Sequence, residues 1–317
     1  MSWFTTGLVD EFLAEAGEFL RAQPARNTVV LTVTEDLRVK GQAGQAQAAQ
    51  PRAGRAQPEN VQPENTLAGS ATTWPGHDEP LFGWWRPDAG RPSVRGAFLH
   101  TPNFPVFLTS MSSDAASELA AGLAATGRRV PGVNAEAAIS ATFAAAWQHR
   151  TRDVAIVQVR LRLFRLGELV RPDPGPEGAP RLAADRDRDL LITWVDAFVR
   201  EVGDPVRQDH ATAVDTRLSY GGFIVWEAGS VPVSMAGISR AVGGMARVGP
   251  VYTPPELRGR GYAGGATVAA SQAARDAGAA EVVLYTNLAN PTSNALYQRL
   301  GYNPVEDRVA VSFQPGT

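Results

Sequence analysis

The segment Arg258-Gly259-Arg260-Gly261-Tyr262-Ala263 is the feature that most constrains how this chain can fold. It follows a strand-like run ending at Val251-Tyr252-Thr253 and opens an alanine-rich stretch of helical character. The first N–H groups of a helix lack intrahelical partners and carry the positive end of its dipole, so an anion can bind there. Glycine lets the backbone come close, and Arg258 and Arg260 add charges suited to phosphate. The segment therefore predicts a strand–turn–helix unit that binds a pyrophosphate group.

Two widespread phosphate-binding patterns do not fit this turn. The dinucleotide fingerprint G-x-G-x-x-G requires a different glycine spacing, and the P-loop G-x-x-x-x-G-K-[ST] requires a lysine that does not follow here. Neither a Rossmann nucleotide site nor a P-loop is therefore predicted.

A second motif follows the turn, Asn290-Pro-Thr-Ser-Asn-Ala-Leu-Tyr297-Gln-Arg-Leu-Gly301-Tyr302. The first motif reads R-x-x-G-x-A, carried by Arg258, Gly261 and Ala263. In this order and spacing, the two motifs together resemble the GNAT superfamily of acyl-coenzyme A-dependent N-acyltransferases. The resemblance covers roughly residues 180 to 313.

The resemblance implies an α/β (α+β) GNAT fold, in which a mixed, mostly antiparallel sheet contains a splayed central pair of strands. It also implies acetyl-CoA as co-substrate, with direct attack by a primary amine in a ternary complex and no covalent intermediate. Within it, the strand binds pantetheine, the turn binds pyrophosphate, and Tyr297 is the proposed general acid. The cofactor-binding residues that it implies are Val251, Tyr252, Thr253, Arg258, Gly259, Arg260, Gly261, Tyr262, Ala263 and Asn290.

Two of these residues also have plain structural interpretations. A phenol with a pKa of about 10 can protonate a departing thiolate, but Tyr297 could equally pack with its hydroxyl bonded to the backbone. Asn290 could hold the pantetheine arm or cap the following helix. Both alternatives stay open at the level of sequence.

The general base is not identified by the sequence. Members of the superfamily often carry a glutamate on the strand before the turn, whereas residues 245–253 contain no carboxylate. Glu227, Asp209, His210 and Glu201 are candidates, and none is favoured over the others. Relay through water, or an amine that arrives already neutral, is equally open.

Composition excludes several classes of function. The 317 residues have a net charge of −2, which argues against nucleic acid as a partner. With no cysteine, the chain has no thiol nucleophile, no disulfide and no cysteine-ligated metal, and we expect no metal cofactor. No apolar run is long enough to span a bilayer and no signal peptide is evident, so we expect a cytoplasmic protein without a membrane partner.

Length predicts two units. We expect a degenerate GNAT-like domain over residues 1–170 with a disordered insertion at about 42–73, a Pro-rich linker at 171–180, and a catalytic domain over 181–317. In the first unit, Pro131-Gly132-Val133 stands where a phosphate turn could have been, but the signature is absent.

Periodicity and turn residues predict the following elements. We expect helices at 6–22, 114–126, 134–150, 185–202, 264–278 and 293–300. We expect strands at 28–33, 81–85, 97–100, 106–108, 154–169, 181–184, 220–227, 231–241, 245–253, 281–286 and 309–313, and a polar loop at 203–215.

Three functional readings follow. The first is an N-acetyltransferase that acts on the amine of a small molecule or peptide. Such an enzyme could also form a homodimer. The second is a non-catalytic acyl-CoA-binding sensor or interaction module, which the missing carboxylate supports and Tyr297 opposes. In the third, the first unit also binds coenzyme A, although one site per chain is expected.

Overall fold

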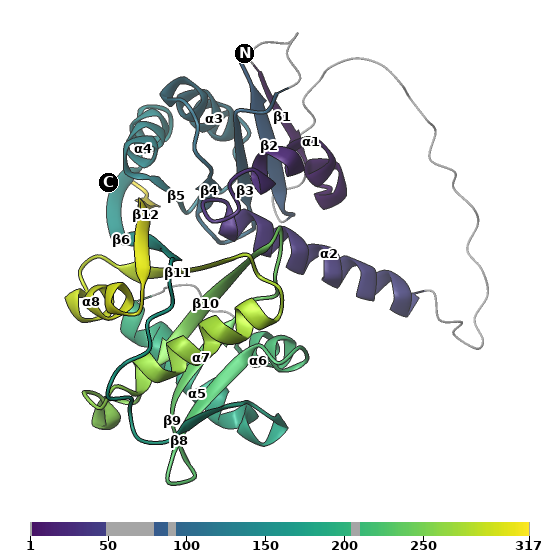
Figure 1. Ribbon diagram of the computed structural model, residues 1–317. Coiled ribbons are helices and arrows are strands. Elements are labelled where there is room, and N and C mark those ends of the chain that lie inside the picture. The colour runs from purple at the N-terminus through teal and green to yellow at the C-terminus, as the bar shows by residue number, and fades with distance from the viewer. Residues whose placement is uncertain (1, 49–78, 88–92, 204–209, 317) are drawn as a thin grey trace.

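The computed structural model describes residues 2–48, 79–87, 93–203 and 210–316. Both halves of the chain have the same order of elements: strand, two helices, three strands, then helix, strand, helix and strand (Figure 1). The first half consists of β1 (Ser2–Thr6), α1 (Val9–Arg21), α2 (Thr28–Ala48), β2 (Leu81–Arg86), β3 (Gly96–His100), β4 (Val106–Leu108), α3 (Ser113–Ala125), β5 (Gly132–Glu136), α4 (Ala137–Thr151) and β6 (Val154–Leu166).

The second half repeats this order with two short 3₁₀ turns added. It consists of β7 (Ala179–Leu182), η1 (Asp185–Asp187), α5 (Arg188–Val202), α6 (His210–Leu218), β8 (Phe223–Ala228), β9 (Val231–Ile238), β10 (Met245–Tyr252), η2 (Pro255–Leu257), α7 (Tyr262–Asp276), β11 (Glu281–Asn287), α8 (Pro291–Arg299) and β12 (Tyr302–Gln314). We propose from this match that the first half is a degenerate copy of the second, divided from it at 171–180.

The strands form one sheet of 12 strands in the order β1-β2-β3-β4-β5-β12-β6-β11-β10-β9-β8-β7. Pairing is antiparallel except between β4 and β5 and between β10 and β11, which are parallel. The last strand of each half lies beside the fifth strand of the other: β12 pairs with β5, and β6 pairs with β11. The C-terminus accordingly lies beside α4 of the first half (Figure 1). The mixed, mostly antiparallel sheet that the sequence predicts is confirmed.

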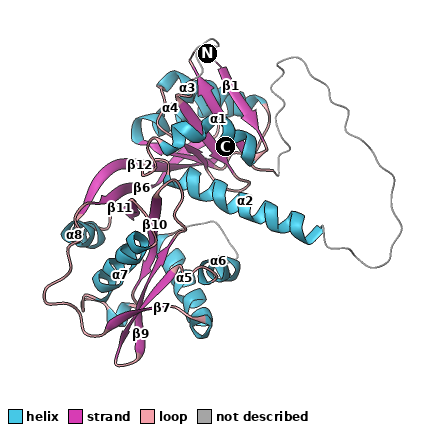
Figure 2. Cartoon of the chain, turned by 45° about the vertical axis from the view of Figure 1, so that its right-hand side comes forward, coloured by secondary structure: helices cyan, strands magenta, loops and turns pink. Residues whose placement is uncertain are grey.

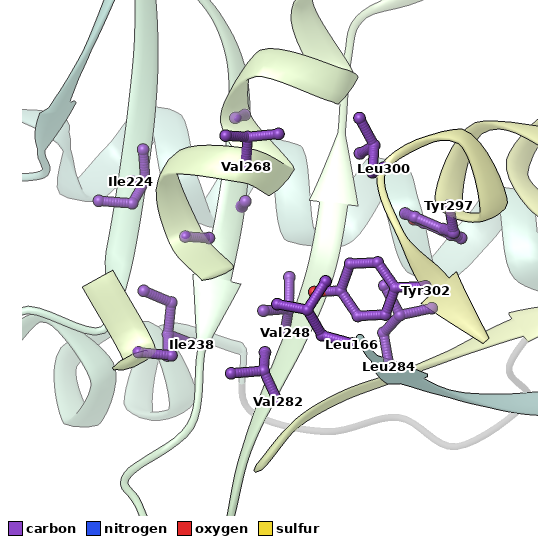
Figure 3. Close-up of a cluster of buried hydrophobic side chains, with 14 of the residues drawn as sticks. Leu166, Ile224, Ile238, Val248, Val268, Val282, Leu284, Tyr297, Leu300 and Tyr302 are labelled. Carbon is purple, nitrogen blue, oxygen red and sulfur yellow. The ribbon is translucent and has the colours of Figure 1, made fainter. Parts of the chain in front are cut away.

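Helices cover both faces of the second half of the sheet (Figure 2). Successive strand residues point to opposite faces, so Phe223 and Val225 pack beneath α5 and α6, whereas Ile224 and Trp226 pack beneath α7. The cluster under α7 extends across the exchanged strand to Phe164 and Leu166 of β6, as Figure 3 shows for part of it. The hydrophobic core of the second half therefore includes side chains from the first.

The structure corrects the predicted strand at 28–33, which is the first part of α2. Its β-branched residues favour a strand locally, but Val30 and Leu31 are buried against α1 and β2. Thr32 and Thr34 donate their hydroxyls to the carbonyls of Thr28 and Val30, which accommodates both polar groups within the helix. Tertiary packing therefore outweighs local propensity here.

Other boundaries also differ from the predictions: β1 was not predicted, and the last strand begins at Tyr302 rather than at 309. Helix α2 continues to Ala48, so residues 42–48 are helical rather than part of an insertion, and residues 49–73 lie outside the described residues. The expected helix at 134–150 begins at Ala137 because the preceding residues form β5, which also places Pro131-Gly132-Val133 at the start of a strand. The expected loop at 203–215 contains the start of α6 from His210. None of the helices in the described ranges has both the length and the apolar character needed to cross a bilayer.

Truncating Phe164 to alanine tests the contribution of the exchanged strand. Phe164 is fully buried and lies opposite Leu284 of β11 and Pro304 of β12, so we expect Phe164→Ala to lower the free energy of unfolding by about 3–5 kcal/mol. Val157→Ala on the same strand is the control, because Val157 is 50% exposed and its loss should cost less than about 1 kcal/mol. Urea denaturation followed by circular dichroism measures both; equal costs would contradict the exchanged-strand core.

Candidate functional site

Strands β10 and β11 separate along their length. They pair only over Met245–Arg247 and Glu281–Val283, at the N-terminal end of β10, and diverge towards its C-terminal end. On its other side β10 has a register shift against β9 between Val248 and Val251. The edge of β10 that faces the opening therefore has backbone groups that a bound molecule could pair with. The splayed pair expected from the sequence is present.

The turn between β10 and α7 has the backbone shape that its glycines allow. Gly259 and Gly261 have φ values of +79° and +82°, in the left-handed region that favours glycine. Gly261 is the N-cap of α7 and has no side chain to cap the helix, so the N–H groups of the first turn, next to the exposed segment 258–261, have no side-chain cap. This is the geometry of an anion site at the mouth of the strand opening.

The two arginines of the turn have different roles. Arg258 donates from Nε to the Thr253 carbonyl at 2.9 Å, and its guanidinium pairs with Glu201 of α5 at 2.7 Å. Arg258 thus ties the end of β10 to the end of α5. Arg260 is exposed, and no residue of the described ranges pairs with it, which leaves it as the turn's available cation.

The Pro-rich segment 171–180 lies along the turn. A Cβ on Gly261 would lie 3.4 Å from the Pro176 Cβ, and one on Gly264 would lie 3.8 Å from the Pro172 Cγ. The Glu177 carbonyl accepts a hydrogen bond of 2.8 Å from the Trp226 indole. This segment therefore forms one wall of the anion site.

Tyr297 lies on α8 within the hydrophobic cluster that includes Val248 of β10 and Leu284 of β11. Its ring meets Tyr302 edge-on at a centroid distance of 6.1 Å, and both rings are visible in Figure 3. Burial raises the pKa of Tyr297 to about 12. Within the described part of the chain its hydroxyl has no hydrogen-bond partner, whereas the Tyr302 hydroxyl lies 2.6 Å from that of Ser271. Tyr297 is therefore a buried, neutral phenol whose hydroxyl is not engaged by any of the described residues.

Asn290 is the N-cap of α8, because its side-chain carbonyl accepts a hydrogen bond of 3.0 Å from the Ser293 backbone. This geometry favours the capping interpretation of Asn290. The neighbouring Asn294 donates to the carbonyls of Asn287 and Asn290 at 2.9 and 2.7 Å. Its own Oδ1 is buried without a partner among the described residues, a feature that sequence inspection had no means to show.

The candidate bases are held by other side chains. Glu227 pairs with Arg181 at 2.7 Å, Glu201 pairs with Arg258, and His210 bonds to Asp196 through Nδ1. Asp209 lies outside the described residues. No cluster of three or more potential metal ligands occurs among the residues that were placed.

The matching opening in the first half is filled by a side chain. Strands β4 and β5 pair over Val106–Phe107 and Val133–Asn134 and then part. Arg308 of β12 lies there, 1% exposed, and donates to the carbonyls of Leu108 and Asn134 at 2.7 and 3.0 Å. Its guanidinium also lies 4.0 Å from the centre of the Phe107 ring. The Arg308 guanidinium thus fills the space between β4 and β5, whereas the equivalent space between β10 and β11 stays open.

Comparison with known proteins agrees with this geometry. Residues 187–302 match the model of the Acetyltransferase (GNAT) family, so the second half of the chain carries a GNAT domain. The family is one of acetyltransferases, which generally use acetyl-CoA. A comparison with curated protein sequences found no match.

Several solved structures share the fold. A Drosophila protein is similar over 98% of this chain and 96% of its own length, with a TM-score of 0.62 and 14% identity. A GCN5-related N-acetyltransferase from Sphaerobacter thermophilus matches over 76% of this chain and 82% of its own, with a TM-score of 0.52 and 15% identity. A GNAT-family acetyltransferase from Colwellia psychrerythraea matches over 74% and 85%, with a TM-score of 0.50 and 12% identity. At these identities the likeness shows the fold, which for the Drosophila protein extends over both halves.

Substituting Gly261 tests the anion site. In Gly261→Val a β-branched residue would replace glycine at a φ of +82° and bring a side chain to the mouth of the turn, so we expect coenzyme A affinity to fall by about tenfold or more. Gly278→Val at the other end of α7 is the matched control, because Gly278 has a similar φ of +90° and open space around it. Calorimetric titration with coenzyme A measures both; equal losses would contradict a local role of the turn.

Proposed function

We propose that this protein is an acetyl-CoA-dependent N-acetyltransferase whose catalytic part is residues 181–317. The observation that carries the proposal is the anion-receptive turn 258–261 at the mouth of the opening between β10 and β11. A diphosphate held at the turn would let the pantetheine arm run along the free edge of β10, past Tyr252 and Val251, towards the point where the strands meet. The strand and turn residues inferred from sequence are the cofactor-binding residues of this proposal, with Asn290 acting through the cap of α8.

Acetyl-CoA supplies an activated acetyl group as a thioester. The turn N–H groups and Arg260 bind its diphosphate, and backbone N–H groups of β10 near Val251 donate to the thioester carbonyl and polarise it. The acceptor nitrogen bonds to the carbonyl carbon, the carbon–sulfur bond breaks, and sulfur leaves with the electron pair. Tyr297 donates its hydroxyl proton towards that sulfur, and the amine releases a proton to water.

The raised pKa of Tyr297 is compatible with this role. A phenol with a pKa of about 12 stays protonated throughout the neutral range. A free thiol with a pKa of about 8.5 in water is the stronger acid, so full transfer from Tyr297 would be uphill there. Burial disfavours a thiolate for the same reason that it disfavours a phenolate, so the two pKa values approach each other inside the cluster.

The acceptor in this proposal is the primary amine of a small molecule or peptide. In this proposal neither nucleic acid nor a membrane is a partner. We also propose a cytoplasmic location, which is compatible with a chain that has no cysteine and a net charge of −2. A homodimer is compatible with this arrangement.

A non-catalytic acyl-CoA sensor is the second candidate. The ion pairs of Glu201 with Arg258 and of Glu227 with Arg181 favour it, because each of these carboxylates already has a cationic partner. Thiol release measured with polyamines, aminoglycosides and peptide amines separates the two, since a sensor binds coenzyme A without turnover.

Tyr297→Phe tests the general acid. We expect kcat to fall at least about tenfold with little change in coenzyme A affinity, because the hydroxyl acts on the leaving sulfur. Below about pH 10 the variant and the wild type should show the same shape of pH profile, because Tyr297 stays protonated over that range. Tyr302→Phe is the control: it removes the bond to Ser271 and should cost about 1 kcal/mol of stability with kcat largely retained. A normal kcat in Tyr297→Phe would remove this assignment.

The filled opening in the first half predicts the stoichiometry. Arg308 occupies the space between β4 and β5, so calorimetry should find one coenzyme A per chain, and Gly261→Val should weaken that single event. A second binding event that persists in Gly261→Val would show that the first half also binds the cofactor.

A further inference from the structure

Arg247 and Tyr285 share one face of the sheet at the point where β10 and β11 meet. Arg247 lies opposite Val283 in the parallel register, and Tyr285 is two residues further along β11, so both side chains point the same way. Their neighbours Ala246, Val248 and Leu284 pack under α7, which places Arg247 and Tyr285 on the opposite face.

This face is closed by the first half of the chain. Met245, on the same face as Arg247, accepts a hydrogen bond of 3.1 Å from the Thr28 hydroxyl at the start of α2. Both views show α2 passing beside the end of β10 (Figures 1 and 2). The face therefore lies between the second-half strands and a first-half helix.

Neither polar side chain has a partner within the described ranges. Arg247 is half-buried and takes part in no side-chain hydrogen bond or ion pair, and the Tyr285 hydroxyl is buried and unbonded. Burial lowers the pKa of Arg247 and raises the pKa of Tyr285, as it does wherever charge is poorly solvated. A half-buried cation and a buried hydroxyl without partners are costly unless something else pairs with them.

Arg217 and Asp36 are the charged side chains that act on Arg247, and Arg217 has the larger effect. Arg217 of α6 lies nearby, and Arg240 of the β9–β10 connection stacks on Tyr220 at 4.2 Å. Asp36 of α2 is the acid that faces this group, and it is exposed. An anion bound at Arg247 would therefore enter a favourable field.

The acid that acts on Tyr285 is Glu306 of β12, which pairs with Arg26 at 2.9 Å and with Arg308 at 2.6 Å. Arg247, by contrast, forms no ion pair with a carboxylate of the described residues. A hollow of about 570 Å³ is lined by Arg26, Arg162 and residues 304–307. Its arginines are paired with acids, because Arg26 pairs with Glu306 at 2.9 Å and Arg162 pairs with Asp307 at 2.7 Å.

The position of Arg247 relative to the opening between β10 and β11 limits what could bind to it. Pantetheine would enter from the turn at the C-terminal end of β10 and run towards the closing point at Arg247 and Val283, with its thioester held near Val251 on the way to that point. An amine must approach this point from the side that the pantetheine arm and α7 leave free. A group that Arg247 holds would therefore lie at the closed end of the strand opening, beyond the thioester.

We propose that Arg247 and Tyr285 bind the carboxylate of the acceptor, and that the acceptor is a short amino acid whose amine and carboxylate are separated by few carbons. This inference rests on the proposed acetyltransferase function and specifies its substrate class. A guanidinium fork matches a carboxylate through two parallel hydrogen bonds, and the phenol adds a third donor. The amine then projects towards the thioester.

Matched pairs of acceptors test the inference. The standard amino acids and their amides are offered to the wild-type protein with acetyl-CoA, and thiol release gives kcat/KM for each. At least one acid should exceed its amide by about tenfold or more, although the amide has the more acidic ammonium group and hence more of the reactive neutral amine. The ratio of acid to amide should fall towards unity in Arg247→Gln and fall less in Tyr285→Phe.

Arg299→Gln is the charge control, because Arg299 is an exposed arginine of α8 and its removal should leave the ratio unchanged. Arg247→Gln removes no ion pair seen in the described residues, so its unfolding midpoint should stay near that of the wild type. Acids and amides turned over equally by the wild type, or a ratio that persists in Arg247→Gln, would overturn the inference.

A second measurement separates this failure from failure of the proposed function. Amino acids are titrated calorimetrically into the protein saturated with coenzyme A. Binding that is lost in Arg247→Gln supports the carboxylate site even if no amine is acetylated, in which case only the proposed catalysis fails. Absence of binding by every amino acid, together with turnover of uncharged amines, overturns the carboxylate site and leaves the acetyltransferase proposal intact.

Discussion

The short parallel pairing of β10 with β11 is the constraint on which the rest of the structure depends. A sheet that pairs only over Met245–Arg247 and then opens leaves backbone donors and acceptors that must find partners or remain in contact with water. Strand β11 satisfies its other edge through β6, but β10 keeps a free edge beside the opening. The cost of this edge is small while solvent reaches it, and a bound extended molecule can take the place of that solvent.

The two halves of the chain meet this constraint in different ways. In the first half, Arg308 fills the gap between β4 and β5, and its guanidinium bonds to two backbone carbonyls, to Asn134 and to Glu306. A cation buried to this extent is tolerable because each of its three nitrogens donates at least one hydrogen bond. Arg247, half-buried at the corresponding pairing point of the second half, has none among the described residues. The same residue type thus closes one opening and, in the proposed enzyme, binds the acceptor carboxylate at the other.

Much of this arrangement was predictable from sequence, because local signals specify it. The glycines of the turn, the apolar runs of β8 to β11 and the N-cap Asn290 each carry a short-range cause, and the predicted strands and helices around them are confirmed within a few residues. The strand predicted at 28–33 was wrong, because burial of Val30 and Leu31 by distant elements outweighed their β propensity.

The exchange of β6 and β12, and the pairing of Arg258 with Glu201, could not be predicted in this way, since they join residues far apart in the chain. Arg247 was missed for a related reason. A charged residue in the otherwise apolar run 245–252 is a signal in its own right, but its meaning depends on whether a partner meets it in the fold. A carboxylate base is the group expected on this strand, whereas the structure has there an arginine without a side-chain partner among the described residues.

The strand exchange also explains why a first half without a phosphate turn would be retained. Phe164 and Leu166 of β6 complete the hydrophobic cluster around Tyr297, so the second half has no finished core without them. Helix α2 closes the face that carries Arg247 and brings Asp36 near it. In the proposed enzyme the second half holds the cofactor, while the first half provides the opposite wall of the acceptor site and part of the core beneath the general acid. A change in α2 would then alter the choice of acceptor while coenzyme A affinity is preserved, because the turn at 258–261 contacts the second half and the segment joining the halves.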